Sequence, residues 1–324
     1  MSNLRDAMGL CLAYGKTNSQ YQTEFEPATG TIWAYFNPAG TPCFSLHLLK
    51  DIAAHDESLT ANRGRIEIDG AMHEASHYVL ASRSPGVFNM GGDLALFSLL
   101  IKAGDRDAIA NYAKLCIDNM HRRIQHFRAS TLTTISLVQG DALGGGFEAA
   151  LTSDVIIAEE SAQMGLPEIL FNLFPGMGAC SLLARRIGLR AAEELILSGK
   201  VMTAAELHKL GVVDVVATDG QGETAVRNWI AKNAKRRNGL QAVYNARQFI
   251  QPVTREELDG IVGLWVDAAM RLTDRDLKMM QRLVRAQSRR IEPAHTGGGA
   301  TVLQMPLAQP LSAVGIHLPV AAML

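Results

Sequence analysis

The chain has 324 residues, of which 48% are apolar and 19% charged, and its formal net charge is −1. This length suits one large domain or a core domain with an appendage. The even charge balance gives no support to a nucleic-acid-binding or membrane-surface protein. We expect a cytoplasmic protein, because the sequence has neither a signal-peptide pattern at its start nor a run of about 18 apolar residues that could cross a bilayer.

Apolar runs rich in β-branched and aromatic residues alternate with helical patterns over the first two hundred residues. The runs predict strands at Thr31–Phe36, Ser76–Ser82, Thr134–Gln139 and Asp154–Ala158. The periodic segments predict helices at Phe44–His55, Leu94–Ile101 and Asp107–Phe127. Strands separated by helices indicate an α/β fold in which helices cover a parallel sheet.

Beyond residue 200 the pattern is nearly all helical. One helix is predicted by an apolar stripe of Leu258, Ile261, Val262, Trp265, Ala269 and Leu272. A second is predicted by a stripe of Leu277, Met280, Leu283 and Val284. We therefore divide the chain into a core over residues 1–200 that holds the active site, a mostly helical region over 201–292, and an irregular apolar tail over 293–324.

The stretch VQGDALGGGFEAAL, Val138 to Leu151, places three glycines between a predicted strand and a short helix. A tight turn without chemistry is one interpretation. Phosphate binding is another, since Gly144, Phe147 and Ala149 fit a loose dinucleotide pattern, although the helix has room for only about two turns. A nucleophile elbow is excluded, because the sequence contains no G-x-S-x-G.

The interpretation that we favour is an oxyanion hole. Glycines allow a substrate oxygen to approach main-chain N–H groups, which are unpaired at a helix start. Such a hole needs two donors, and a second glycine turn, Gly91-Gly92-Asp93, lies between a predicted strand and a predicted helix. Two such turns can converge at one end of a parallel sheet, where ligands bind in folds of this kind.

The segments FNMGGDL and VQGDALGGGFEAALTSDVIIAEESAQMGLPEI resemble the two signature segments of the crotonase (enoyl-CoA hydratase/isomerase) superfamily, over roughly residues 30–290. The resemblance implies a spiral of repeated β-β-α units, a helical C-terminal region that mediates trimers, and no cofactor. It implies that the amides of Gly92 and Gly145 polarise a thioester carbonyl. Glu148 and Glu168 fall on its two carboxylate positions.

A finer resemblance joins GGDLALF, MGLPEILFNLFPGMGA and RLVRAQSRR to the bacterial diffusible signal factor synthases. It implies a quorum-sensing function: dehydration of a 3-hydroxyacyl thioester on acyl carrier protein, then hydrolysis to a free cis-2-unsaturated fatty acid. It also implies a sensor kinase as an inhibitory partner. An ordinary enoyl-CoA hydratase acting on coenzyme A thioesters and a non-catalytic, partner-binding homologue remain as alternatives.

Roles for individual residues follow as hypotheses. By resemblance, Glu168 is the base for the α-proton and Glu148 the acid for the departing hydroxyl. Leu143, Met177 and Trp265 are candidates for the acyl-binding wall, with simple core packing as the alternative for each. Two basic clusters could steer an acidic carrier protein, although a solvated helix face explains them as well: Lys232, Lys235, Arg236 and Arg237, and Arg282, Arg285, Arg289 and Arg290.

The segment His73-Glu74-Ala75-Ser76-His77 is a formal match to the zinc motif H-E-x-x-H. Zinc binding requires both histidines on one helix face, whereas the segment leads into a predicted strand. We therefore expect no metal site. The four cysteines, at positions 11, 43, 116 and 180, form no CxxC pair and are typical of reduced thiols.

Overall fold

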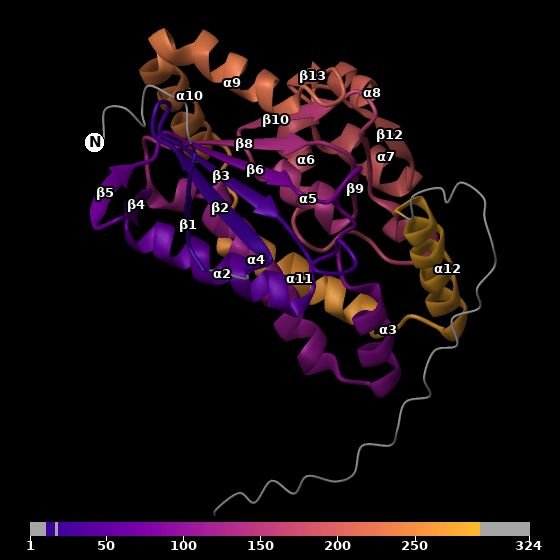
Figure 1. The fold of residues 1–324 in the computed structure, drawn as a ribbon. Helices are drawn as coiled ribbons and strands as arrows, with labels where there is room; N and C mark the ends of the chain where they lie inside the picture. Colours follow the sequence, from indigo (N-terminus) through magenta and orange to yellow (C-terminus); the bar gives the residue numbers. More distant parts are fainter. Residues whose placement is uncertain (1–10, 17–18, 292–324) are drawn as a thin grey trace, which may run out of the picture. The chain divides into compact units, whose positions relative to one another are not determined.

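The structure, a computed structural model, describes residues 11–16 and 19–291. These residues belong to one compact unit that ends at Ile291 (Figure 1). The predicted tail over residues 293–324 lies outside the described residues. Among the described helices, none has the length and apolar character needed to cross a membrane.

Within the described part of the chain, the largest sheet has seven strands in the order β1-β2-β3-β6-β8-β10-β13. The strands from β3 to β13 pair in parallel, whereas β1, β2 and β3 pair antiparallel. The bounds are β1 (Leu12–Tyr14), β2 (Tyr21–Glu26), β3 (Thr31–Phe36), β6 (His77–Ser82), β8 (Thr133–Val138), β10 (Val155–Glu159) and β13 (Val215–Ala217).

A smaller sheet of four short strands has the order β12-β11-β9-β7. Its strands are β7 (Val87–Asn89), β9 (Asp141–Leu143), β11 (Gln163–Gly165) and β12 (Val201–Thr203), and a separate hairpin joins β4 (Arg65–Ile68) to β5 (Ala71–Glu74). Each of β6, β8 and β10 in the large sheet is followed by β7, β9 or β11 in the small one and then by helix. This repetition is the predicted spiral of β-β-α units, and the α/β class is confirmed.

Helices cover both faces of the large sheet (Figure 1). Residues of β3 alternate: Ile32, Ala34 and Phe36 pack with α2 and α4, and Trp33 and Tyr35 pack with α9. The helices are α2 (Leu46–Ala61), α3 (Leu94–Ala103), α4 (Arg106–Ile124), α5 (Gly145–Leu151), α6 (Ala179–Ile187), α7 (Leu189–Ser198), α8 (Ala204–Lys209), α9 (Gly222–Asn233), α10 (Arg237–Ile250), α11 (Arg255–Ala269) and α12 (Asp274–Ile291), with single turns η1 (His126–Arg128), η2 (Pro167–Phe171) and η3 (Ala234–Arg236).

The C-terminal region is mostly helical, but two of its elements are strands. β12 pairs with β11 and β13 pairs with β10, so both sheets extend beyond residue 200. Trp265 and Leu258 of α11 are buried, as the apolar stripe predicted, and so is Leu277 of α12. The side chain of Val284, predicted in the second stripe, lies outside the described residues.

Candidate active site

The two glycine turns meet. One follows β7 and contains Gly91, with φ +88°, and the other follows β9 and contains Gly144, with φ +52°. A Cβ atom on Gly91 would lie 2.8 Å from the backbone N of Gly145, and one on Gly146 would lie 2.0 Å from the carbonyl O of Asn89. Glycine is required here because the two backbones approach too closely for any side chain.

The contact brings the two predicted amide donors into one region. Gly144 N donates to Gly165 O at 2.9 Å, and Gly91 N donates to Asn89 Oδ1 at 2.8 Å. Neither Gly92 N nor Gly145 N has a hydrogen-bond acceptor among the described residues. Both glycines line the same cavity, so two amides remain available to an oxygen atom placed there.

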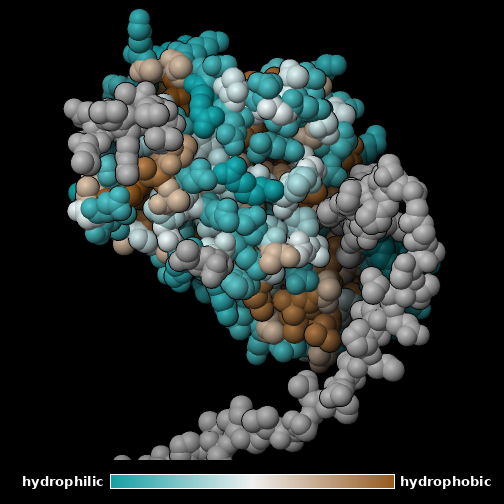
Figure 2. Space-filling model, in the orientation of Figure 1, coloured by the Kyte–Doolittle hydropathy of each residue, from teal (hydrophilic) through white to brown (hydrophobic). Residues whose placement is uncertain are grey.

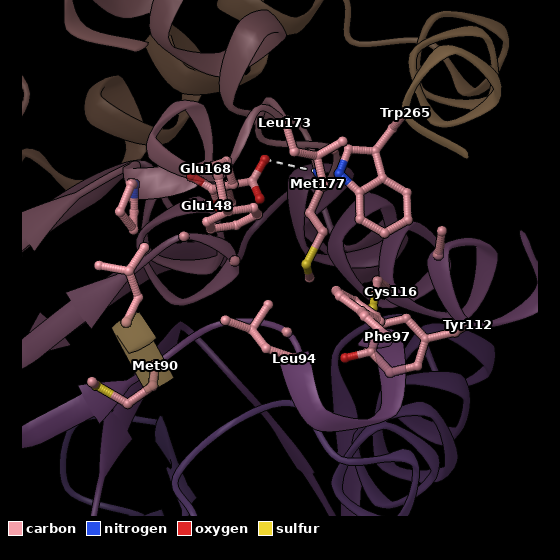
Figure 3. A pocket seen from close by; sticks show the side chains of 18 residues that line it. Met90, Leu94, Phe97, Tyr112, Cys116, Glu148, Glu168, Leu173, Met177 and Trp265 are labelled. Carbon is pink, nitrogen blue, oxygen red and sulfur yellow. Dashed lines mark hydrogen bonds between the residues drawn. The ribbon is translucent and has the colours of Figure 1, made fainter. Parts of the chain in front are cut away.

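Glu148 extends from the first turn of α5 and is 1% exposed. Its Oε1 accepts a hydrogen bond from Met177 N, in the loop before α6, at 2.8 Å (Figure 3). It accepts a second from the N of Ala179, the first residue of α6, at 2.9 Å. Burial raises the pKa of Glu148 above its ordinary value, and the backbone donors at Ala179, Met177 and Gly178 oppose that rise.

Glu168 comes from η2, directly after Pro167, and also lines the cavity. Its Oε2 is buried and has no hydrogen-bond partner among the described residues. Burial raises the pKa of Glu168, and the charge of neighbouring Glu148 raises it further. The backbone amides therefore favour the anion of Glu148, whereas the charge of Glu148 and the orphaned oxygen of Glu168 favour the protonated form of Glu168.

The cavity around these groups encloses about 670 Å³ of empty space, including its opening. Its wall is mainly apolar and aromatic, as in sites for small organic ligands. The lining residues are Met90, Gly92, Leu94, Phe97, Tyr112, Ala113, Cys116, Gly144, Gly145, Glu148, Pro167, Glu168, Phe171, Leu173, Gly176, Met177, Trp265 and Leu283.

The structure brings together six of the seven residues predicted for the site. Met177 and Trp265 line the cavity with the glutamates and glycines (Figure 3), and Met177 Sδ would lie 2.6 Å from a Cβ on Gly145. Leu143 does not line this cavity. It is the last residue of β9 and packs with Val87 and Met90 instead, so its expected place in the acyl-binding wall is not supported.

Several lining residues were missed by the sequence analysis. Phe97 of α3 and Tyr112 and Cys116 of α4 form a buried wall facing the glutamates (Figure 3). Tyr112 and Cys116 are four residues apart and therefore share a helix face. That spacing was the available signal, but it does not distinguish a cavity wall from ordinary core.

The zinc-like segment has the wrong geometry for a helical metal site. His73 lies on β5 and His77 begins β6, and the described residues contain no group of three metal-binding side chains. All four cysteines are free. The cation clusters are exposed at Lys232, Lys235, Arg236, Arg282 and Arg285, whereas Arg237 is half-buried. The side chains of Arg289 and Arg290 lie outside the described set.

Comparison with known proteins places these features in a family. The enoyl-CoA hydratase/isomerase family model matches residues 72–249, which is more than half of the chain. A peroxisomal fatty acid beta-oxidation multifunctional protein of Arabidopsis thaliana is 32% identical over 160 residues, which cover 49% of this chain and 21% of the relative. Cyclohexa-1,5-dienecarbonyl-CoA hydratase of Thauera aromatica is 30% identical over 157 residues, covering 48% and 60%.

The chain therefore spans about a fifth of the plant protein's length. Solved structures share the fold. Human mitochondrial delta3-delta2-enoyl-CoA isomerase has a TM-score of 0.68 at 22% identity, covering 84% of this chain and 99% of that one. DspI of Pseudomonas aeruginosa has a TM-score of 0.61 at 23% identity, covering 84% and 90%. The match of the family model over most of the core shows that the chain belongs to the enoyl-CoA hydratase/isomerase family.

Proposed function

We propose that the chain is a hydro-lyase that moves water across the α–β bond of an acyl thioester. In the finer form of the proposal, it dehydrates a 3-hydroxyacyl-carrier-protein thioester and then hydrolyses the product to a cis-2-unsaturated fatty acid signal. One observation carries the coarser reaction: two carboxyl groups of unequal proton affinity share one apolar cavity with two unpaired backbone amides.

The amides of Gly92 and Gly145 act on the thioester carbonyl. Removal of the α-proton moves negative charge onto the carbonyl oxygen, and two fixed N–H donors in a mainly apolar cavity stabilise that charge. Glu168 takes the α-proton. Glu148 gives a proton to the β-hydroxyl, which leaves as water while the Cα–Cβ double bond forms. One proton enters the pair and one leaves it, so the charge of the pair is unchanged.

The resting proton distribution bears on the direction of the reaction. The pKa of Glu168 is raised by the charge of Glu148, and the anion of Glu148 is stabilised by backbone amides. In our proposal the proton of the pair therefore lies on Glu168 and the charge on Glu148, which suits hydration: Glu148 activates water and Glu168 protonates Cα. Dehydration in the assignment above starts from the opposite distribution. Microscopic reversibility allows both directions. Dehydration then uses the less populated state of the pair, in which the proton lies on Glu148 and the charge on Glu168.

The finer proposal rests on the motif resemblance, and the surroundings of the cavity are compatible with it. A second, open groove shares Met90, Gly92 and Leu94 with the cavity. It therefore adjoins the cavity at Gly92, one of the two proposed donors to the thioester carbonyl. Its described lining mixes polar and apolar side chains and includes no Lys or Arg, which suits the uncharged pantetheine arm that carrier-protein and coenzyme A thioesters have in common. After dehydration, either carboxylate would take a proton from a water molecule that attacks the thioester carbonyl. The C–S bond then breaks, the thiol of the carrier leaves with that proton, and the free acid is released.

Partners are also part of the proposal. Exposed apolar side chains gather on α3 (Figure 2), where Leu99 is 64% exposed, and on α10, where Phe249 and Ile250 are 89% and 78% exposed. Such surfaces suit burial in an oligomer, and we propose the homotrimer that the resemblance implies. An inhibitory sensor kinase and an acidic carrier protein are proposed on the resemblance alone.

Reversible hydration of a coenzyme A thioester is the second candidate. It is favoured by the relatives, which are named as a fatty acid beta-oxidation protein and a CoA hydratase. It is also the direction for which the resting proton distribution is prepared. The third candidate, a non-catalytic binding protein, does not explain why two glutamates of raised pKa are kept in an apolar cavity.

Incubation with 3-hydroxydodecanoyl carrier protein and, separately, with 2-dodecenoyl-CoA tests the three candidates. Mass spectrometry and chromatography identify the products. A free cis-2 acid from the first substrate supports signal synthesis. Reversible formation of the 3-hydroxyacyl thioester without free acid supports the hydratase and overturns the finer proposal. Turnover of neither substrate, by a folded protein, overturns the hydro-lyase proposal itself.

A further inference from the structure

The turn that contains Gly92 is bonded to helix α4 through the hydroxyl of Tyr112. Phe44 and Gly92 form an isolated parallel bridge, in which Phe44 N donates to Gly91 O at 2.8 Å. Asp93 N, the next donor along the turn, donates to the hydroxyl of Tyr112 at 3.2 Å. The same hydroxyl donates to Phe44 O at 2.5 Å. The Tyr112 hydroxyl therefore joins both sides of the bridge one residue beyond Gly92.

The ring of Tyr112 has a separate contact surface. It lines the cavity and stacks edge-on against Phe97, with ring centroids 4.9 Å apart and an interplanar angle of 88° (Figure 3). Phe97 in turn packs under the turn, since a Cβ on Gly92 would lie 2.7 Å from its ring. The turn thus has the Phe97 ring beneath Gly92 and the Tyr112 hydroxyl beside Asp93.

We propose that Tyr112 is a positioning residue, whose hydroxyl fixes the direction of the Gly92 N–H toward the substrate carbonyl. The inference rests on the proposed function, because it assigns the Gly92 amide to carbonyl polarisation. The hydroxyl has no role as an acid or base. It is buried, and burial raises the pKa of Tyr112 well above its ordinary value, so it remains a neutral hydrogen-bonding group.

A small misalignment of a fixed donor is costly, because an N–H aimed beside the developing charge stabilises it less. Removing a donor outright lowers kcat by about 10²–10³-fold. Loss of the Tyr112 hydroxyl leaves the donor present but loosely held. We therefore expect Tyr112→Phe to lower kcat by a smaller factor, about 10- to 100-fold, and to leave KM within about two-fold, since the ring and its contacts with the acyl chain remain.

The experiment compares Tyr112→Phe with Tyr78→Phe. Tyr78 is a fully buried tyrosine whose hydroxyl bonds to Tyr21 and Asp56 and which does not line the cavity. Tyr78→Phe is therefore a control for the general effect of removing a buried tyrosine hydroxyl. Tyr78→Phe should lose stability without loss of carbonyl polarisation. Replacement of Tyr112 by p-aminophenylalanine restores the donor to Phe44 O but only a weak acceptor for Asp93 N, so it should recover only part of the lost kcat.

Carbonyl polarisation is measured directly, by infrared spectroscopy of octanoyl-CoA labelled with ¹³C at the carbonyl. The ligand is saturated and is bound to a Glu168→Gln parent, so neither proton transfer nor hydration occurs. In the parent we expect the carbonyl band at a lower frequency than in water, and in the added Tyr112→Phe variant we expect it to move back toward the value in water.

The outcomes separate the two proposals. A band that is unshifted in the parent shows that the cavity does not polarise a thioester and overturns the proposed function. A band that is shifted in the parent and unmoved by Tyr112→Phe overturns the role of Tyr112 alone. If Tyr112→Phe does not fold, the p-aminophenylalanine variant decides, because its amino group donates to Phe44 O but accepts only weakly from Asp93 N. A band that moves back toward the value in water supports the inference, and a band unmoved from that of the parent overturns it.

Discussion

Glu168 packs directly on the backbone of Gly144: a Cβ on that glycine would lie 2.5 Å from Glu168 Oε1. The glycine also has φ +52°, a left-handed conformation that side chains disfavour. The N–H of Gly144 donates to Gly165 O, so this first glycine of the triplet contributes no amide to the proposed oxyanion hole. It provides the space in which the second carboxyl group sits.

The first prediction is that Gly144→Ala lowers activity by at least about 10²-fold, because the methyl group displaces the proposed base from the substrate. Steady-state kinetics and thermal unfolding measure the two effects. Gly104→Ala is the matched control. Gly104 has φ +67°, with nothing within 4 Å of an added Cβ, so it should cost about 1 kcal/mol of stability and no activity. An active Gly144→Ala variant would contradict the assigned position of Glu168.

The second prediction separates the roles of the two glutamates. Glu168→Gln should abolish exchange of the α-proton with deuterium in a saturated acyl thioester, whereas Glu148→Gln should retain exchange and lose dehydration. Each change should lower turnover by about 10²–10⁴-fold. Mass spectrometry of the recovered thioester measures the exchange. If only Glu148→Gln loses exchange, the roles are reversed.

The third prediction concerns the pH dependence of kcat/KM. The active pair carries one proton, and burial raises the pKa of both Glu148 and Glu168. The rate should fall on the acid side as Glu148 gains a proton and on the alkaline side as Glu168 loses one. Both limbs should lie above the ordinary glutamate pKa. An acid limb at that ordinary value would show that Glu148 is not desolvated.

The fourth prediction concerns stability. Because the pKa of Glu168 is raised in the folded protein, folding favours its protonated form. That contribution is complete below the unfolded pKa and is lost as pH rises through the folded one, at about 1.4 kcal/mol per pKa unit. The free energy of unfolding of Glu168→Gln should therefore equal that of the wild type at low pH. As the pH rises toward the folded pKa of Glu168, the variant should become progressively more stable than the wild type.

Denaturant titrations at several pH values check this expectation. Glu160→Gln removes a charge from an exposed glutamate next to β10, and it serves as the control for the change in net charge. A stability difference between Glu168→Gln and the wild type that does not change with pH would contradict the buried, electrostatically strained state of Glu168.

The fifth prediction concerns acyl chain length. Cys116 is fully buried and lines the cavity on the side of α4, so Cys116→Phe should exclude the longest chains while short ones still react. Leu143→Met is the control. Leu143 lies outside the lining, and this volume-conserving change should leave the chain-length profile unchanged. The measurement is the relative kcat/KM over a series of thioesters of increasing chain length. A profile unaltered by Cys116→Phe would show that the acyl chain does not lie against Cys116.

Much of the fold could be predicted because the central strands have strong local signals. The predicted strand at Thr31–Phe36 has the bounds of β3, and those at Ser76–Ser82 and Asp154–Ala158 lie within one residue of β6 and β10. The three-residue strands β7, β9 and β11 were missed. A strand of that length is too short to show alternation, and it exists because the sheet beside it supplies its hydrogen bonds.

The site could be predicted only where backbone geometry constrains the sequence. Gly91, Gly144 and their neighbours were identifiable because close approach and positive φ permit glycine alone. The acyl-binding wall was predicted only in part, at Met177 and Trp265, since Leu143 and Cys116 are both buried residues in apolar surroundings. Whether such a side chain faces a cavity or the core depends on tertiary packing, which neither composition nor periodicity records.

The segment from Met177 to Ala179, which leads into α6, has two roles. Met177 N and Ala179 N bind the carboxylate of Glu148, while the Met177 sulfur lies against Gly145 in the cavity wall. A backbone shift at this loop would therefore alter acid strength and substrate size together. Substitutions in this segment that are selected for activity on longer substrates should also change the optimum pH of the enzyme. Substitutions in α4 selected in the same way should leave the optimum pH unchanged.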